Sequence, residues 1–162
     1  MKKQEVYEFL NDKKIWHEID EHEAVFTMED LEKVDLKYPN LDAKNLFVRD
    51  DKKKNYYLIS VKANKRVDLK EFKKRFQTRR LSFSSDKDLM EKLKLMPGSV
   101  SPLGILNNTD KDVIFYLDKE FLKEPSIIGV HPNENTAMVW LKTQELIDLI
   151  KEHGNIVHVV EL

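Results

Sequence analysis

The sequence predicts an α+β protein built on a mixed sheet. Helix-like and strand-like segments intermingle along its 162 residues, without the regular alternation of a doubly wound fold. Hydrophobic residues make up 41% of the chain, enough for one core, and this length is typical of one domain. No segment approaches the roughly 18 apolar residues of a membrane span, and no apolar signal segment follows the N-terminus. We therefore expect a cytoplasmic protein without membrane contacts.

Two helices are expected before the first strands. Residues 2–12 place apolar side chains at helical spacing, which indicates a short amphipathic helix. Thr27, followed three residues later by Asp30, resembles a capping box and predicts a helix through about Lys37.

A β-hairpin is expected next. The apolar runs 46–48 and 56–61 are strand-like, and the polar segment 50–55 between them is typical of a turn. Its tip would carry Lys52, Lys53 and Lys54.

The second half of the chain is predicted to mix helices and strands. Residues 69–76 repeat apolar positions at helical spacing, and Ser85 is a suitable N-cap for a helix to about Leu95. Thr143 is expected to cap a last helix that ends at Gly154. The expected strands are 113–117, 127–130, 137–141 and 156–160.

The charge is unevenly distributed. Residues 44–80 hold 14 basic and 4 acidic side chains, a net +10, whereas the rest of the chain carries −11, so that the whole carries −1. A basic face in an otherwise acidic protein is typical of polyanion binding, because phosphate neutralisation supplies most non-specific affinity for nucleic acids. The alternative is a solvated surface that keeps the protein soluble.

Several kinds of chemistry are excluded or disfavoured. The chain has no cysteine, which excludes disulfides, thiolate nucleophiles and Cys-type zinc sites. The histidines lack the spacing of a zinc protease, and no phosphate-loop, dinucleotide or Gly-x-Ser-x-Gly motif is present. We expect neither a metal nor a cofactor. The five histidines are His17, His22, His131, His153 and His158.

The segment Gly98–Pro102 is the most unusual loop of the chain. Glycine permits positive φ and a close approach of the backbone to a ligand, while Pro102 fixes φ and has no N–H. The amides of Ser99, Val100 and Ser101 could then converge on one oxygen, as in an anion nest or oxyanion hole. The alternative is an ordinary connecting turn.

Two further positions carry polar groups at strand ends. Lys44 directly precedes an apolar strand, where its ammonium could hold a phosphate or simply extend into solvent. His131 and Asn133 follow the apolar run 127–130, where they could line a pocket or form a turn.

Four segments in this order resemble the YbaK / prolyl-tRNA synthetase editing-domain superfamily, and within it the free-standing prolyl-tRNA editing proteins. The strand beginning Lys-Asn-Leu-Phe and the loop Pro-Gly-Ser-Val-Ser-Pro are its specific motifs. The likeness extends over nearly the whole chain. The segments are 44–50, 80–85, 97–104 and 131–137.

The resemblance implies a single aminoacyl-tRNA editing domain over residues 1–162, with a mixed, mostly antiparallel, barrel-like sheet and surrounding helices. The implied activity is metal-independent hydrolysis of alanine mischarged on proline tRNA, in which the 2′-OH of the terminal adenosine helps to orient water. Lys44 would engage the phosphate or ribose of the tRNA 3′ end, and the backbone from Gly98 to Pro102 would hold the aminoacyl carbonyl.

The remaining site residues follow from the same resemblance. His131 would be the pocket histidine, and we place Asn45 and Asn133 with it as substrate-binding residues. Phosphates of the acceptor stem would be tracked by Lys52, Lys53, Lys54, Arg79 and Arg80. The partners are thus the acceptor end of proline tRNA and, as a further candidate, prolyl-tRNA synthetase. Two alternatives stay open: a deacylase of the same fold that acts on cysteinyl-tRNA(Pro), and a non-catalytic tRNA-binding protein.

Overall fold

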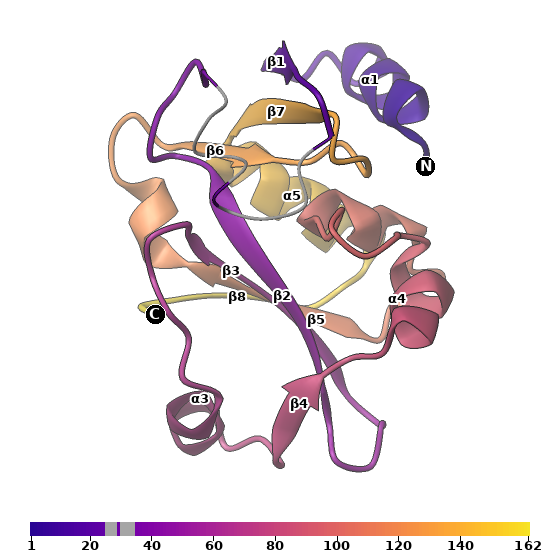
Figure 1. Cartoon of the computed structure of the whole chain (residues 1–162), viewed down its shortest axis with the longest axis vertical. Coiled ribbons are helices and arrows are strands. Elements are labelled where there is room, and N and C mark those ends of the chain that lie inside the picture. The colour runs from indigo at the N-terminus through magenta and orange to yellow at the C-terminus, as the bar shows by residue number, and fades with distance from the viewer. Residues whose placement is uncertain (25–28, 30–34) are drawn as a thin grey trace.

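A five-stranded mixed sheet forms the centre of the computed structural model, which describes residues 1–24, 29 and 35–162 (Figure 1). Its strand order is β4-β2-β3-β5-β8; β2 pairs antiparallel with β3 and β4, whereas β3–β5 and β5–β8 are parallel. The long strand β2 runs from beside β6, in the upper part of the view, to the hairpin at the bottom. The strands are β2 (Ala43–Asp50), β3 (Tyr56–Lys62), β4 (Leu81–Phe83), β5 (Val113–Asp118) and β8 (Val157–Val160).

A second, antiparallel sheet lies at the other end of β2, in the order β1-β7-β6. A parallel bridge between Asp42 and Gly129 joins the two sheets, and the Gly129 amide donates to the Leu41 carbonyl at 2.9 Å. Glycine is required there, because a Cβ would lie 2.4 Å from Cζ3 of Trp140. Its strands are β1 (His17–Glu21), β6 (Ile127–Val130) and β7 (Ala137–Lys142).

The helices pack around these sheets. In α3, Asp68 caps the first turn by accepting from the amides of Lys70 and Glu71, and Phe72 faces the core while the lysines face solvent. In α4, Ser85 accepts from the amide of Asp88 as predicted. The helices are α1 (Lys3–Asp12), α3 (Leu69–Phe76), α4 (Asp86–Leu93), α5 (Thr143–His153) and the 3-10 turns η1 (Pro102–Asn107) and η2 (Lys119–Leu122).

The core is divided between the two faces of β2. Successive strand side chains point to opposite faces. Ala43 and Phe47 therefore belong to the larger cluster, whereas Val48, with Leu46 beside it, packs with α3 on the other face. The same alternation places the side chains of Lys44 and Asn45 on opposite faces of β2.

The α+β class is confirmed, and so is the hairpin 46–61. The two sheets do not close into a barrel. The expectation for Thr143 was wrong: Lys142 is the N-cap, and the Thr143 hydroxyl instead donates to the Phe121 carbonyl at 2.7 Å. The helix predicted from Thr27 to Lys37 falls mainly outside the described residues. Among the described residues, no helix is long and apolar enough to cross a bilayer.

Candidate active site

The loop between α4 and η1 is held by its own hydrogen bonds. Gly98 adopts φ +86°, and the Ser99 amide donates to the Met96 carbonyl at 3.1 Å, closing a tight turn. The fully buried Ser101 hydroxyl donates to the His131 carbonyl at 2.6 Å and accepts from the Leu103 amide at 3.2 Å. This hydroxyl therefore joins the loop to the end of β6 and caps η1.

Two backbone donors of this loop are available for a ligand. The amides of Val100 and Ser101 have no hydrogen-bond acceptor within the described part of the chain. An unpaired buried N–H is unfavourable unless it binds water or a ligand oxygen. These amides are neighbours along the backbone, and either could donate to an oxyanion or a polarised carbonyl oxygen of a ligand.

Asn45 connects β2 to the loop. Its Nδ2 donates to the Val100 carbonyl at 3.3 Å, while its Oδ1 accepts a hydrogen bond from the buried Ser60 hydroxyl of β3. The Asn45 side chain is therefore held in place by Ser60 of the sheet, and it fixes the position of the Val100 carbonyl. Of the adjacent pair Lys44 and Asn45, it is Asn45 whose side chain contacts the loop.

One ring nitrogen of His131 has no hydrogen-bond partner among residues 1–24, 29 and 35–162. Its Nδ1 lies 2.9 Å from the Ala137 carbonyl, an acceptor only, so the proton is assigned to Nδ1 and the lone pair to Nε2. Burial lowers the pKa of His131 below its usual value, and the His22 ring lowers it further, against the opposing effects of Ala137 and Asp42. The imidazole is therefore neutral at pH 7.

Two residues that no sequence motif singles out as site residues lie beside His131. The rings of His22 and His131 are 6.5 Å apart, and Nε2 of His22 is buried with no hydrogen-bond partner among the described residues. Asp42 is buried where the sheets meet, and burial raises its pKa. Nothing in the sequence marked them, because strands distant in the chain bring them to His131.

Asn133 lies in the same turn but faces the N-terminus. Its Nδ2 donates to the Met1 carbonyl at 2.8 Å, and its Oδ1 is buried without a hydrogen-bond partner in the part of the chain that is described. The residue adopts φ +64°, which asparagine tolerates better than most residues. Its position supports a role in fixing the turn after His131.

Lys44 lies on the opposite face of β2 from Asn45. Its ammonium donates to the Lys65 carbonyl, and no hydrogen bond joins it to the Gly98–Pro102 loop among the residues that are described. Burial lowers the pKa of Lys44, and the Arg66 guanidinium lowers it further. Hydrogen bonds thus join the loop to Asn45 and to His131, whereas the side chain of Lys44 lies on the opposite face of β2.

The predicted tRNA-binding residues lie at the far end of β2 (Figure 1). The hairpin tip begins ~17 Å from Asn45, at ~3.3 Å per strand residue. The buried Asp50 carboxylate shapes this tip by accepting from the amides of Lys52 and Lys54. Lys52, Lys53, Lys54 and Arg80 are exposed, whereas Arg79 is engaged by Asp51 through two hydrogen bonds of 2.6 and 3.0 Å.

Comparison with known proteins gives a consistent result. The model of the aminoacyl-tRNA editing domain matches residues 22–149. The chain is 37% identical to the prolyl-tRNA editing protein ProX of Acetoanaerobium sticklandii, over 99% of this chain and 97% of that one. It is also 32% identical to the prolyl-tRNA synthetase associated domain-containing protein 1 of Mus musculus, over 85% and 83% of the two chains.

A solved structure supports the same fold. A crystal structure presented as that of a candidate trans-editing enzyme for prolyl-tRNA synthetase superposes with a TM-score of 0.71 and 19% identity, covering 98% of this chain and 94% of the other. At this identity the likeness concerns the fold alone.

Proposed function

Because this chain belongs to the aminoacyl-tRNA editing domain family and is an aminoacyl-tRNA hydrolase, we propose that it removes mischarged alanine from proline tRNA in trans. The single observation that carries the proposal is the loop whose Val100 and Ser101 amides have no acceptor in the described chain, beside Asn45 and His131. In this proposal residues 1–162 act as one deacylase domain.

The chemistry needs little beyond positioning. Water adds to the ester carbonyl carbon, the bond to the ribose 3′ oxygen breaks, and the products are alanine and the free 3′-hydroxyl, to which the proton passes. The amides of Val100 and Ser101 stabilise the charge that develops on the carbonyl oxygen, a contribution typically worth ~3–4 kcal/mol for one such donor. The 2′-OH of the terminal adenosine orients the water.

All the predicted residues except Asn133 and Arg79 have a part in this proposal. Gly98, Ser99 and Pro102 hold the loop in shape, Asn45 fixes the Val100 carbonyl, and the Nε2 lone pair of His131 accepts from a substrate donor. Lys44 binds the 3′ end of the tRNA from the face of β2 opposite Asn45. The exposed lysines of the hairpin and Arg80 contact acceptor-stem phosphates.

A physical need for such an enzyme exists in protein synthesis. A synthetase site built for proline cannot strongly reject alanine, because a few missing carbons change binding by only about 1–3 kcal/mol. A second site that excludes proline removes the error after it is made.

The test is deacylation of proline tRNA charged with alanine or with cysteine, by the wild-type protein and by Lys44→Ala. We expect fast loss of alanine and slow loss of cysteine, with Lys44→Ala strongly impaired. Faster loss of cysteine would favour the second deacylase activity instead. Binding of proline tRNA with neither ester cleaved would favour a non-catalytic role. An ester with a 2′-deoxy terminal adenosine should react slowly; full-speed cleavage would exclude the part given to the 2′-OH.

A further inference from the structure

Phe83, at the end of the edge strand β4, is the most exposed large apolar side chain of the described residues. It is 63% exposed, whereas Leu81, two positions earlier in the same strand, is buried. The other phenylalanines of the described chain are buried or have a second ring or a cation against their own ring. No such contact involves Phe83 within residues 1–24, 29 and 35–162, so its ring is available to a ligand.

The backbone fixes the position of this ring. Phe83 pairs with Val48 in the antiparallel ladder between β4 and β2, and the amide of Ser84 donates to the Phe47 carbonyl at 3.0 Å. Side chains directly opposite one another in such a ladder lie on the same face of the sheet. Phe83 therefore lies on the face where Val48 and Leu81 pack with α3. With the strand fixed on both sides, only the side-chain torsions of Phe83 lose freedom when a ligand binds.

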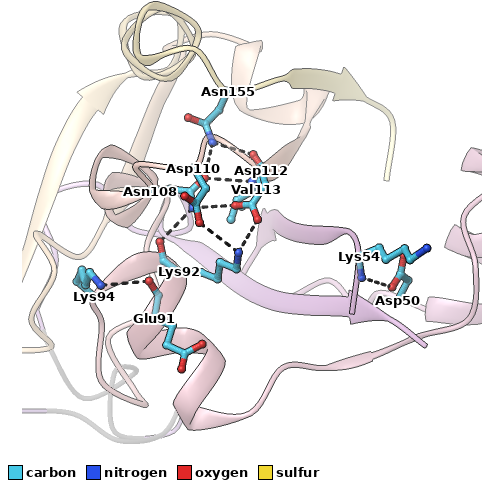
Figure 2. A network of polar contacts seen from close by, with 10 residues as sticks. All are labelled: Asp50, Lys54, Glu91, Lys92, Lys94, Asn108, Asp110, Asp112, Val113 and Asn155. Carbon is cyan, nitrogen blue, oxygen red and sulfur yellow. Dashed lines mark hydrogen bonds and ion pairs between the residues drawn. The ribbon is translucent and has the colours of Figure 1, made fainter. Parts of the chain in front are cut away.

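The same face of β2 carries Lys44, because strand side chains alternate. Val48, the partner of Phe83, is four residues from Lys44, or ~13 Å at ~3.3 Å per residue. Asp50 follows ~7 Å further along in the other direction. Its carboxylate accepts from the Lys54 amide at 2.9 Å and shapes the basic hairpin (Figure 2). Phe83 thus lies between the places where the proposed function puts the tRNA 3′ end and the acceptor stem.

The surroundings of Phe83 are basic. Residues 44–80, which supply β2, the hairpin and α3, carry a net charge of +10. Helix α3 contacts β4 and has a basic last turn, and Arg80, directly before β4, is exposed. Proteins that bind single-stranded nucleic acids combine these two features, because cations attract the phosphates while an aromatic ring stacks on a base. An apolar protein partner would instead have to desolvate the cations, which is unfavourable.

We propose that Phe83 stacks on an unpaired base of the tRNA 3′ end. The inference rests on the proposed function for the identity of the RNA. The ~13 Å between Lys44 and Val48 is the length of about four stacked nucleotides, so a strand whose last nucleotide is bound at Lys44 brings one of its unpaired bases to Phe83. Every base has an aromatic face, so the contact adds affinity without selecting a sequence. It gives a function to β4, which contributes no residue to the active site.

The first experiment measures binding of deacylated proline tRNA by Phe83→Leu over a range of salt concentrations. Leucine keeps an apolar side chain but has no aromatic ring, so the affinity should fall by about tenfold, as is typical when one base stack is lost. The dependence of log affinity on log salt should keep the slope of the wild type, because no phosphate contact is removed. Phe83→Trp should bind at least as tightly as the wild type. Since Phe83 is exposed, neither variant should change the melting temperature.

Trp16→Leu is the matched control. Trp16 is also an exposed aromatic residue, but Nζ of Lys142 lies 4.8 Å from the centre of its ring, and it precedes β1 in the other sheet. Its replacement should leave the affinity for tRNA unchanged. Equal affinities of Phe83→Leu and the wild type would overturn the inference and leave the exposed ring to a protein partner. A Phe83→Leu variant that binds weakly because its salt slope is flatter would also contradict stacking.

The second experiment identifies the base. Proline tRNA with an abasic nucleotide at one unpaired 3′ position at a time is bound to the wild type and to Phe83→Leu. At one position the missing base should weaken binding to the wild type about as much as Phe83→Leu does, and the two changes together should cause no further loss, because both remove the same contact. Losses that multiply at every position would show that no base stacks on Phe83.

These readouts are independent of catalysis. If the wild-type protein cleaves no aminoacyl ester, the proposed function fails, while the affinity for deacylated tRNA still tests the stacking. If the wild-type protein deacylates alanine and Phe83→Leu binds and reacts as the wild type does, only the stacking is wrong.

Discussion

Replacing Ser101 by alanine tests whether the loop acts through its backbone. The fully buried hydroxyl makes two hydrogen bonds, to the His131 carbonyl and from the Leu103 amide. Each is worth ~1 kcal/mol net, so Ser101→Ala should lower the free energy of unfolding by about 2 kcal/mol. For a chain of 162 residues this corresponds to a fall of roughly 4–8 °C in melting temperature.

The effect on activity should be modest by comparison. In the proposed mechanism the Ser101 amide stabilises the reacting oxygen, and alanine keeps that amide, so single-turnover deacylation of alanyl-tRNA(Pro) should fall by no more than about tenfold. Ser99→Ala is the control, because its hydroxyl has no hydrogen bond among those of the described residues. An unchanged melting temperature with a loss of activity above ~10³-fold would identify the hydroxyl as a nucleophile and refute the reasoning.

Three further predictions concern the surroundings of the site. Burial lowers the pKa of His131, so the unfolded chain binds that proton more readily; the stabilisation is present above about pH 6.5 and lost as the pH falls below it. The free energy of unfolding, measured by urea titration at pH values above and below about 6.5, should depend less steeply on pH in His131→Asn than in the wild type. The same pH dependence in both proteins would contradict a buried neutral imidazole. Gly129→Ala should cost about 1–3 kcal/mol, because its Cβ would meet the Trp140 ring 2.4 Å away; a wild-type melting curve would show that the ring moves freely. Neutralising Lys52, Lys53 and Lys54 together should weaken tRNA binding and flatten its salt dependence without changing the hydrolysis rate of bound substrate, whereas an unaltered salt dependence would remove the hairpin from the interface.

Local patterns were sufficient for most of the fold. The helical spacing of apolar residues in 69–76 predicted α3, and the Ser85 cap predicted α4. Both signals can be recognised in the sequence because each involves residues only a few positions apart. The three-residue strand β4 was missed, since its pairing with β2 depends on contacts more than 30 positions away. Thr143 was read as a cap because its hydroxyl suits that role, but the nearby Phe121 carbonyl is the acceptor that binds it.

For the site, the sequence identified the parts better than their arrangement. The loop motif and His131 were found in advance, and the structure joins them through the Ser101 hydroxyl. The opposite directions of Lys44 and Asn45 follow from strand alternation, which becomes informative only once the loop is known to contact Asn45. His22 approaches His131 only through the pairing of β1 with β7, which no local pattern encodes.

The most direct test of the central claim is single-turnover hydrolysis of proline tRNA carrying alanine, compared with the same tRNA carrying proline, with the protein in excess. We predict rapid release of alanine and near-background release of proline, because the second site must spare the correct product. Equal rates for the two esters, or release of proline alone, would contradict it.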